Sequence, residues 1–324
     1  MGRLRTVTTG LLLFGVSLLS TLLVLEAALR IGALSRGEPR RSIVEERPKS
    51  RMKEPDFRPP GFRLGNKRDA FRILVIGDSF SWGDGVYWWD AYPHRLESRL
   101  NAVSRGERFE VINWSRPGWN TVRQLRSLEG RMDELDPDLV ILAFVLNDPE
   151  PVERSRLEQM LQAAEGRQPP PGLNAWLFGH SRLYALVWTR FENSRTHREL
   201  GAFYRSLFAG EHWEACRRAL KRLRNLTRKR GRPLVLMIFP VFDSPMDDRY
   251  PYADLHARVR EQGDALRVPV LDLFEVFAGM DTARLAVVPF TNAHPSEIAH
   301  RITADAMVDY LRRQRLIPPI RNRP

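Results

Sequence analysis

The chain has 324 residues, of which 43% are hydrophobic, so it can bury a sizeable core and is not globally disordered. Its single cysteine, Cys216, excludes an intramolecular disulfide framework. The formal net charge of +12 comes mostly from arginines, which are spread among acidic residues rather than gathered in one block. In the densest basic run, 217–232, leucines at helical spacing leave the arginines on the outer face. We therefore expect solvated helix faces and no nucleic-acid partner.

The first predicted element is a membrane-spanning helix. Residues 6–25 carry no charge, and a helix of that length reaches about 30 Å, the thickness of the hydrocarbon core of a bilayer. The run is longer than the roughly 7–15 apolar residues of a cleavable signal peptide, and only poor cleavage sites follow it. We predict that residues 1–34 form a cytoplasmic stub and an uncleaved transmembrane helix. Arginines on both sides of the run leave its orientation open from charge alone.

A polar tether, 35–68, is expected to join this helix to one α/β domain, 69–324. In that domain, apolar runs alternate with helical patterns. The strand candidates are almost continuously apolar, as in strands buried on both faces; they cover 71–77, 109–114, 139–146, 232–239 and 268–274. Helical periodicity fits 91–104, 120–135, 212–230, 253–266 and 296–314. This alternation predicts a three-layer α/β/α fold with a central parallel sheet of about five strands.

Residues 149–211 interrupt the alternation and are predicted to form a helical insertion. The segment contains a proline-rich turn at 167–172 and an aromatic-rich stretch at 173–191. We expect its helices to pack on the core. The alternative is that they form a lid, or a surface that leans on the bilayer near the anchor.

Four short motifs follow strand ends or precede the last helix. They are Gly-Asp-Ser-Phe with Ser79, Arg-Pro-Gly-Trp with Gly118, Leu-Asn-Asp-Pro with Asn147, and Ala-His-Pro-Ser with His294. Any one of them occurs by chance in many proteins, whereas four in this order on a matching α/β pattern are specific. Over roughly residues 70–315, the chain resembles the SGNH (GDSL-type) hydrolase family, whose blocks carry Ser, Gly, Asn and His in this order.

The resemblance implies a flavodoxin-like SGNH hydrolase fold and a serine esterase. Ser79 would be the nucleophile and His294 the base, because a serine hydroxyl attacks an ester only when a neighbouring group takes its proton. The oxyanion hole would consist of the Ser79 and Gly118 N–H groups and the Asn147 amide, and such donors typically stabilise a transition state by about 2.7–4 kcal/mol each. We expect no cofactor and no metal, because the remaining histidines lack metal-ligand spacing.

The chain departs from the family pattern at one position. The family usually has an aspartate three residues before the histidine, where this chain has Thr291, followed by Asn292. Loss of that carboxylate costs a rate factor of about 10⁴ in the best-studied serine triad. A Ser–His dyad could suffice with Asn292, Thr291 or a backbone carbonyl orienting the ring. Another acid, such as Asp281 or Glu297, could also reach in. An inactive descendant is the remaining alternative.

These observations predict a membrane-anchored hydrolase of O-acyl esters, with an acylated glycan or lipid as substrate. One alternative is an O-acyltransferase acting on extracytoplasmic polysaccharide, and another is a non-catalytic anchored binding domain. The resemblance to anchored relatives implies a single-pass membrane protein with an extracytoplasmic catalytic domain.

Overall fold

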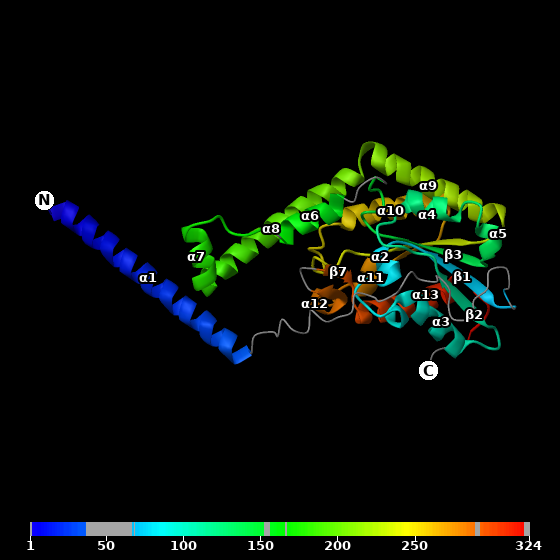
Figure 1. Ribbon diagram of the computed structural model, residues 1–324, viewed down its shortest axis with the longest axis horizontal. Helices are drawn as coiled ribbons and strands as arrows, with labels where there is room; N and C mark the ends of the chain where they lie inside the picture. The colour runs from blue at the N-terminus through cyan, green and yellow to red at the C-terminus, as the bar shows by residue number, and fades with distance from the viewer. Residues whose placement is uncertain are drawn as a thin grey trace. The chain divides into compact units, whose positions relative to one another are not determined.

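The computed structural model describes residues 2–36, 67, 69–151, 156–165, 167–288 and 292–320 (Figure 1). Almost all of the predicted tether, 35–68, lies outside these residues. The chain divides into two compact units. We call residues 1–46 and 161–198 the helical unit, and residues 47–160 and 199–324 the α/β unit.

The α/β unit is built on a five-stranded parallel sheet with the strand order β2-β1-β3-β4-β5. The strands are β1 (Phe71–Ile76), β2 (Phe109–Asn113), β3 (Leu139–Phe144), β4 (Leu234–Ile238) and β5 (Val270–Asp272). All residues of β3 and β4 are buried, as expected of central strands covered on both faces. The predicted α/β class and parallel sheet are confirmed, and the order is that of flavodoxin-like sheets.

Helices cover both faces of this sheet (Figure 1). On one face lie α4 (Thr121–Leu128), α9 (Gly210–Lys229) and α10 (Ala253–Leu266), and on the other α3 (Tyr92–Val103) and α13 (Glu297–Arg313). The shorter elements of the unit are α2 (Ser79–Trp82), the 3₁₀ turn η2 (Trp88–Asp90), α5 (Met132–Leu135), α11 (Leu273–Phe277) and α12 (Thr282–Leu285).

Three local predictions differ from the structure. The single helix expected over 120–135 is wrong, because Gly130 adopts a φ of +80° and separates α4 from α5. The strand expected over 268–274 ends at Asp272, whose carboxylate accepts a hydrogen bond from Phe274 N–H and caps α11. A two-stranded antiparallel sheet of β6 (Ala286–Val288) and β7 (Asn292–Pro295) was not predicted.

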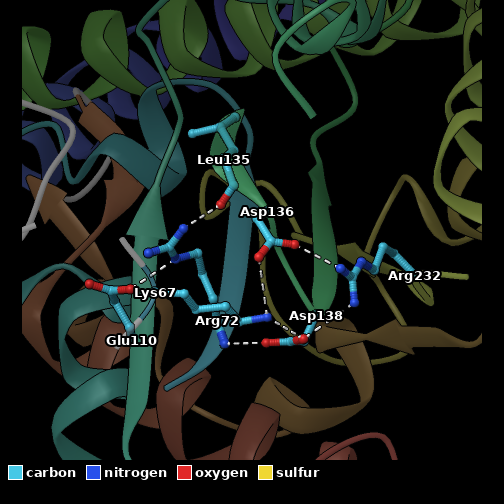
Figure 2. Close-up of polar contacts among 7 residues, drawn as sticks. All are labelled: Lys67, Arg72, Glu110, Leu135, Asp136, Asp138 and Arg232. Carbon is cyan, nitrogen blue, oxygen red and sulfur yellow. Dashed lines mark hydrogen bonds and ion pairs between the residues drawn. The ribbon is translucent and has the colours of Figure 1, made fainter. Parts of the chain in front are cut away.

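A cluster of charged residues joins the sheet strands at the edge where they begin (Figure 2). Arg72 of β1 is fully buried, and its guanidinium donates to Glu110 of β2 at 2.8 Å and to the Leu135 carbonyl at 2.7 Å. Asp138, just before β3, accepts from the Arg72 backbone N–H at 2.8 Å and from Arg232 at 3.4 Å. This edge is opposite the carboxyl ends of the strands, so the cluster serves the fold rather than the predicted site.

The helical unit contains α1 (Gly2–Arg36), α7 (Leu173–His180) and the first part of α8 (Arg182–Leu207). The predicted insertion also holds α6 (Arg156–Glu165). The expectation that its helices pack on the core is correct for the end of α8, where Leu200 to Leu207 supplies buried apolar side chains. It is wrong for α7, which has no buried residue.

Candidate active site

The sheet order explains why three of the four motifs converge. Ser79 follows β1, Gly118 follows β2 and Asn147 follows β3, and these strands are neighbours in the order β2-β1-β3. Parallel strands end at the same edge of a sheet, so the segments after them meet there. The loop that holds Gly118 is joined to the loop after β1 directly, because Arg116 N–H donates to the Gly77 carbonyl at 3.3 Å.

Ser79 is the first residue of the short helix α2. The Asp78 side chain caps this helix by accepting a hydrogen bond from Phe80 N–H at 2.9 Å. The chain passes so close to itself that a Cβ on Gly77 would lie 2.5 Å from Ser81 Oγ, so a glycine is needed at that turn. The Ser79 N–H is at a helix start, where backbone N–H groups have no partner within the helix.

His294 lies in β7 and reaches the serine. Its Nε2 is 2.8 Å from Ser79 Oγ, and its Nδ1 is 2.6 Å from Asn292 Oδ1. The same Asn292 oxygen accepts the backbone N–H of His294 at 3.1 Å. Because a backbone N–H can only donate, the atom facing Nδ1 must be the amide oxygen. Nδ1 therefore carries the proton, and the Nε2 lone pair faces the Ser79 hydroxyl.

The surroundings of His294 favour its neutral form. Burial lowers the pKa of the imidazole below its ordinary value of 6.5, although the negative charge of Asp84 acts in the opposite direction. The Phe80 ring packs against the imidazole with its centroid 5.2 Å away. A neutral imidazole with a free lone pair can accept a proton, so the ring is prepared to act as a base.

Gly118 lies in a tight turn at the edge of the sheet. Trp119 N–H donates to the Arg116 carbonyl at 3.1 Å, and Gly118 has a φ of +72° after Pro117, as in a type II turn. A Cβ at Gly118 would meet no atom within 4 Å, so the backbone angle and not lack of space requires the glycine here.

Asn147 is half-buried in the turn after β3, where Asp148 N–H donates to the Val145 carbonyl at 2.9 Å. Its side chain lies beside Asp78, on the loop that holds Ser79. Its Oδ1 is buried and, among the described residues, has no hydrogen-bond partner.

Two buried carboxyl groups lie behind these loops. Burial raises the pKa of Asp78 to about 7, and burial together with the charge of Asp78 raises the pKa of Asp148 well above its ordinary value. Asp148 accepts hydrogen bonds from Val145 N–H, Thr121 and Gln124 at 2.7 to 3.1 Å. Both groups thus shape the loops that follow β1 and β3.

Of the acids proposed as alternative orienters of the imidazole, Glu297 is the first residue of α13 and Asp281 has a capping role. Asp281 caps α12 by accepting from Ala283 N–H, and Thr291 lies outside the described residues. The Nδ1 position is taken by Asn292. His300 is buried in α13, accepts Tyr92 N–H at 3.2 Å, and has its pKa lowered to about 3 by burial, so it is a structural residue.

The sequence did not single out Asp84 as part of the site. The charge of this residue acts on both His294 and Asp78, which places it beside the site. The Gly-Asp-Gly turn just after the nucleophile motif was the available signal.

Two cavities of the α/β unit are lined by neither Ser79 nor His294. One, of about 690 Å³, lies behind the Asn147 loop and includes Asp148, Glu150 and Cys216, while the other, of about 710 Å³, lies between α4 and α9. The hydrogen bonds of His294 to Ser79 and Asn292 define the candidate site. In the described part of the chain, no group of His, Cys, Asp and Glu is arranged to hold a metal ion.

The GDSL-like Lipase/Acylhydrolase family matches residues 75–302, which is more than half of the chain. Among solved structures, the chain is similar to TesA (16% identity, covering 76% of this chain and 99% of that chain, TM-score 0.45). It is also similar to the esterase EstA from Pseudoalteromonas sp. (14% identity, covering 75% of this chain and 98% of that chain, TM-score 0.42). Another similar structure is Axe2, an acetylxylan esterase from Geobacillus stearothermophilus (18% identity, covering 74% of this chain and 93% of that chain, TM-score 0.45).

No curated protein matches the sequence. The extent of the family match and the order of its motifs show that the chain belongs to the GDSL-like lipase/acylhydrolase family.

Proposed function

We propose that the protein is a serine esterase whose catalytic triad is Ser79, His294 and Asn292. The observation that carries this proposal is the continuous hydrogen-bonded chain from Ser79 Oγ through the imidazole to Asn292 Oδ1, with distances of 2.8 and 2.6 Å. Asn292 takes the place of the family aspartate. It fixes the same tautomer as an aspartate would, because it presents its oxygen to Nδ1.

The reaction would proceed in two steps through an acyl-enzyme. Ser79 Oγ attacks the carbonyl carbon of an ester while its proton moves to His294 Nε2. The imidazolium then gives this proton to the leaving alkoxide, which departs as an alcohol and leaves the acyl group on Ser79. Water attacks the acyl carbonyl, again losing a proton to Nε2, and that proton returns to Ser79 Oγ as the carboxylic acid leaves.

The negative oxygen formed in each step would be stabilised by three donors, the N–H groups of Ser79 and Gly118 and the amide of Asn147. The strand order β2-β1-β3 supports this proposal, because the loops after these three strands are neighbours. The neighbouring Asp78 carboxyl would favour one orientation of the Asn147 amide, whose N–H groups would then be available to the substrate.

An uncharged triad partner has a chemical consequence. Asn292 orients the ring but cannot neutralise the imidazolium, and burial disfavours the charged ring further. We therefore expect a slower enzyme than an Asp-containing relative, active on O-acyl esters of good leaving groups. The natural substrate is proposed as an acylated glycan or lipid.

Turnover of p-nitrophenyl acetate by the full chain tests the proposal. The wild type should release p-nitrophenol, Ser79→Ala should lose this activity, and the exposed-serine control Ser98→Ala should keep it. Equal rates for wild type and Ser79→Ala would reject the esterase. In a second arm, an oligosaccharide acceptor that gains an acyl group at the expense of hydrolysis would indicate acyl transfer.

We further propose that α1 is a retained membrane anchor and that the catalytic domain is extracytoplasmic. Gly10–Gly32 is long and apolar enough to cross a bilayer, a property that anchors share with signal sequences. Retention is supported by Glu26, which accepts hydrogen bonds from Arg182 and Leu183 N–H at 2.9 and 2.8 Å and so belongs to the folded helical unit. The intact mass of the membrane-purified chain decides between a retained anchor and a cleaved signal sequence, because cleavage would remove α1. A reporter fused to the C-terminus tests the orientation.

A further inference from the structure

The start of α8 is joined to the end of the uncharged part of α1. Glu26 Oε2 accepts from Ser181 Oγ at 2.9 Å and from Leu183 N–H at 2.8 Å, while Oε1 accepts from Arg182 N–H at 2.9 Å. Arg30, one turn further along α1, donates to the His180 carbonyl at 2.5 Å. A carboxylate at a helix N-terminus satisfies N–H groups that have no partner within the helix. These bonds fix where the α7–α8 junction lies along α1.

That place is the end of the uncharged run of α1. Glu26 is the first charged residue after the uncharged run 6–25, and the described side chains from Gly10 to Leu25 are all exposed. A run of this length spans about 30 Å of hydrocarbon. If α1 is the membrane anchor proposed above, on which this inference rests, the α7–α8 junction lies at the level of the lipid headgroups.

The first half of α8 has three distinct sides. One side is half-buried within the helical unit and includes Tyr184, Ala185 and Trp188. A second side, about 200° away from Val187 around the helix, is exposed and polar, with Arg182, Thr189 and Asn193. The third side, with Val187 and Phe191, is exposed and apolar, and α7, which comes just before α8 in the chain, also exposes large apolar side chains.

We define this side of α8 together with the exposed apolar side chains of α7 as the α7–α8 face; its residues are Leu173, Trp176, Val187 and Phe191, which are 70%, 56%, 59% and 56% exposed. Arg190 lies within the face on α8 and is also exposed. Large apolar side chains grouped in this way mark an interaction surface, because a folded chain in water gains by burying them. Aromatic rings with arginines beside them are typical of the membrane–water interface, where an arginine can extend its charge to the headgroups.

We propose that the α7–α8 face lies in the headgroup region of the bilayer that α1 enters, so that the helical unit holds the membrane by a spanning helix and an interfacial helix pair. The partner is a lipid surface rather than a protein, because Glu26 and Arg30 attach this face at the end of the span. On one side of α1, Leu29 and Gly32 are half-buried together with Glu26. The glycine has no side chain, so it allows the helices to approach closely there.

Spin labels on single introduced cysteines of the full chain test the proposal in vesicles of phosphatidylcholine and phosphatidylglycerol. The sites are Val187→Cys on the face, Thr189→Cys on the polar side of the same helix, and Leu18→Cys in the middle of the span. Wild type treated in the same way measures background labelling at the buried Cys216. Accessibility to oxygen, which concentrates in lipid, is compared with accessibility to a water-soluble nickel chelate.

We expect the label at 187 to favour oxygen at least about threefold more than the label at 189, with the label at 18 deeper still. Glu26→Ala should make the label at 187 more mobile and more accessible to nickel. If the label at position 18 is in lipid but the labels at positions 187 and 189 are equally accessible to the nickel chelate, the interfacial role of the α7–α8 face is refuted while the membrane anchor stands. If 18 is also aqueous, the anchor falls and this inference with it. Spin–spin broadening at 187 that disappears on dilution with unlabelled chain would assign the face to a second copy and overturn the proposal.

Discussion

Replacing Asn292 by aspartate restores a charge at the position where the structure shows only a neutral oxygen. That oxygen is 2.6 Å from His294 Nδ1. A carboxylate at hydrogen-bonding distance raises the pKa of a histidine by about 1–3 units, which corresponds to about 1.4–4 kcal/mol of imidazolium stabilisation. Because the imidazolium forms in the transition state, Asn292→Asp should raise kcat/KM about 10- to 100-fold.

The pH dependence gives a second readout of the same change. The neutral imidazole is the base, so activity falls on acidification through the pKa of His294. In the wild type, burial places that pKa below 6.5. Asn292→Asp should move the acidic limb of the kcat/KM profile to higher pH by about 1 unit or more.

Two variants control this experiment. Asn292→Ala removes the acceptor that fixes the tautomer of His294. This variant should lower kcat/KM by a factor between about 10² and about 10⁴. Asn193→Asp adds the same charge at an exposed position of α8 and should change neither rate nor profile. The measurement is p-nitrophenyl acetate hydrolysis from pH 5 to 9. The reasoning is refuted if Asn292→Asp leaves both rate and profile unchanged, or if Asn292→Ala retains wild-type kcat/KM.

Three further outcomes follow from the site and the fold. Asn147→Ala should lower kcat by about 10²–10³ with little change in KM; an equal loss through KM alone would contradict its role as an oxyanion donor. Arg72→Met leaves Glu110 buried without its partner, so it should lower the free energy of unfolding by about 3–5 kcal/mol in urea titrations. The double variant Arg72→Met, Glu110→Leu should recover most of this loss. If the single and the double variant lose equally, the ion pair is not the cause. The pKa of Asp78 is raised from 3.8 to about 7, so its protonated form stabilises the fold at low pH and this contribution is lost as pH rises toward 7. Asp78→Asn should therefore gain stability relative to wild type between pH 4 and 7, by up to about 4 kcal/mol, and a constant difference would contradict the shift.

The sheet and the convergence of the motifs could be predicted because they depend on local signals. Continuous apolar runs such as 139–146 identify buried strands, and parallel strands must end at one edge, which brings the segments after them together. The break between α4 and α5 was less visible, because Gly130 is tolerated within a helix as well as at its end.

Contacts between distant residues could not be predicted in the same way. Glu26 and Leu183 are 157 residues apart, and nothing near either one in the sequence indicates the bond between them. The role of Asn292 was one of several open alternatives, since an asparagine two residues before a histidine is also an ordinary turn former. In the structure, the Asn292 oxygen faces both the backbone N–H and the ring Nδ1 of His294. The contact with the ring is what an ordinary turn-forming asparagine would lack.

The central claim is that His294 activates the hydroxyl of Ser79, and labelling with a fluorophosphonate probe measures this most directly. Mass spectrometry of the labelled full chain should find one adduct, on Ser79, which is absent in Ser79→Ala and forms at least about 10²-fold more slowly in His294→Ala. An adduct on another residue, or equal labelling rates with and without the imidazole, would contradict the account.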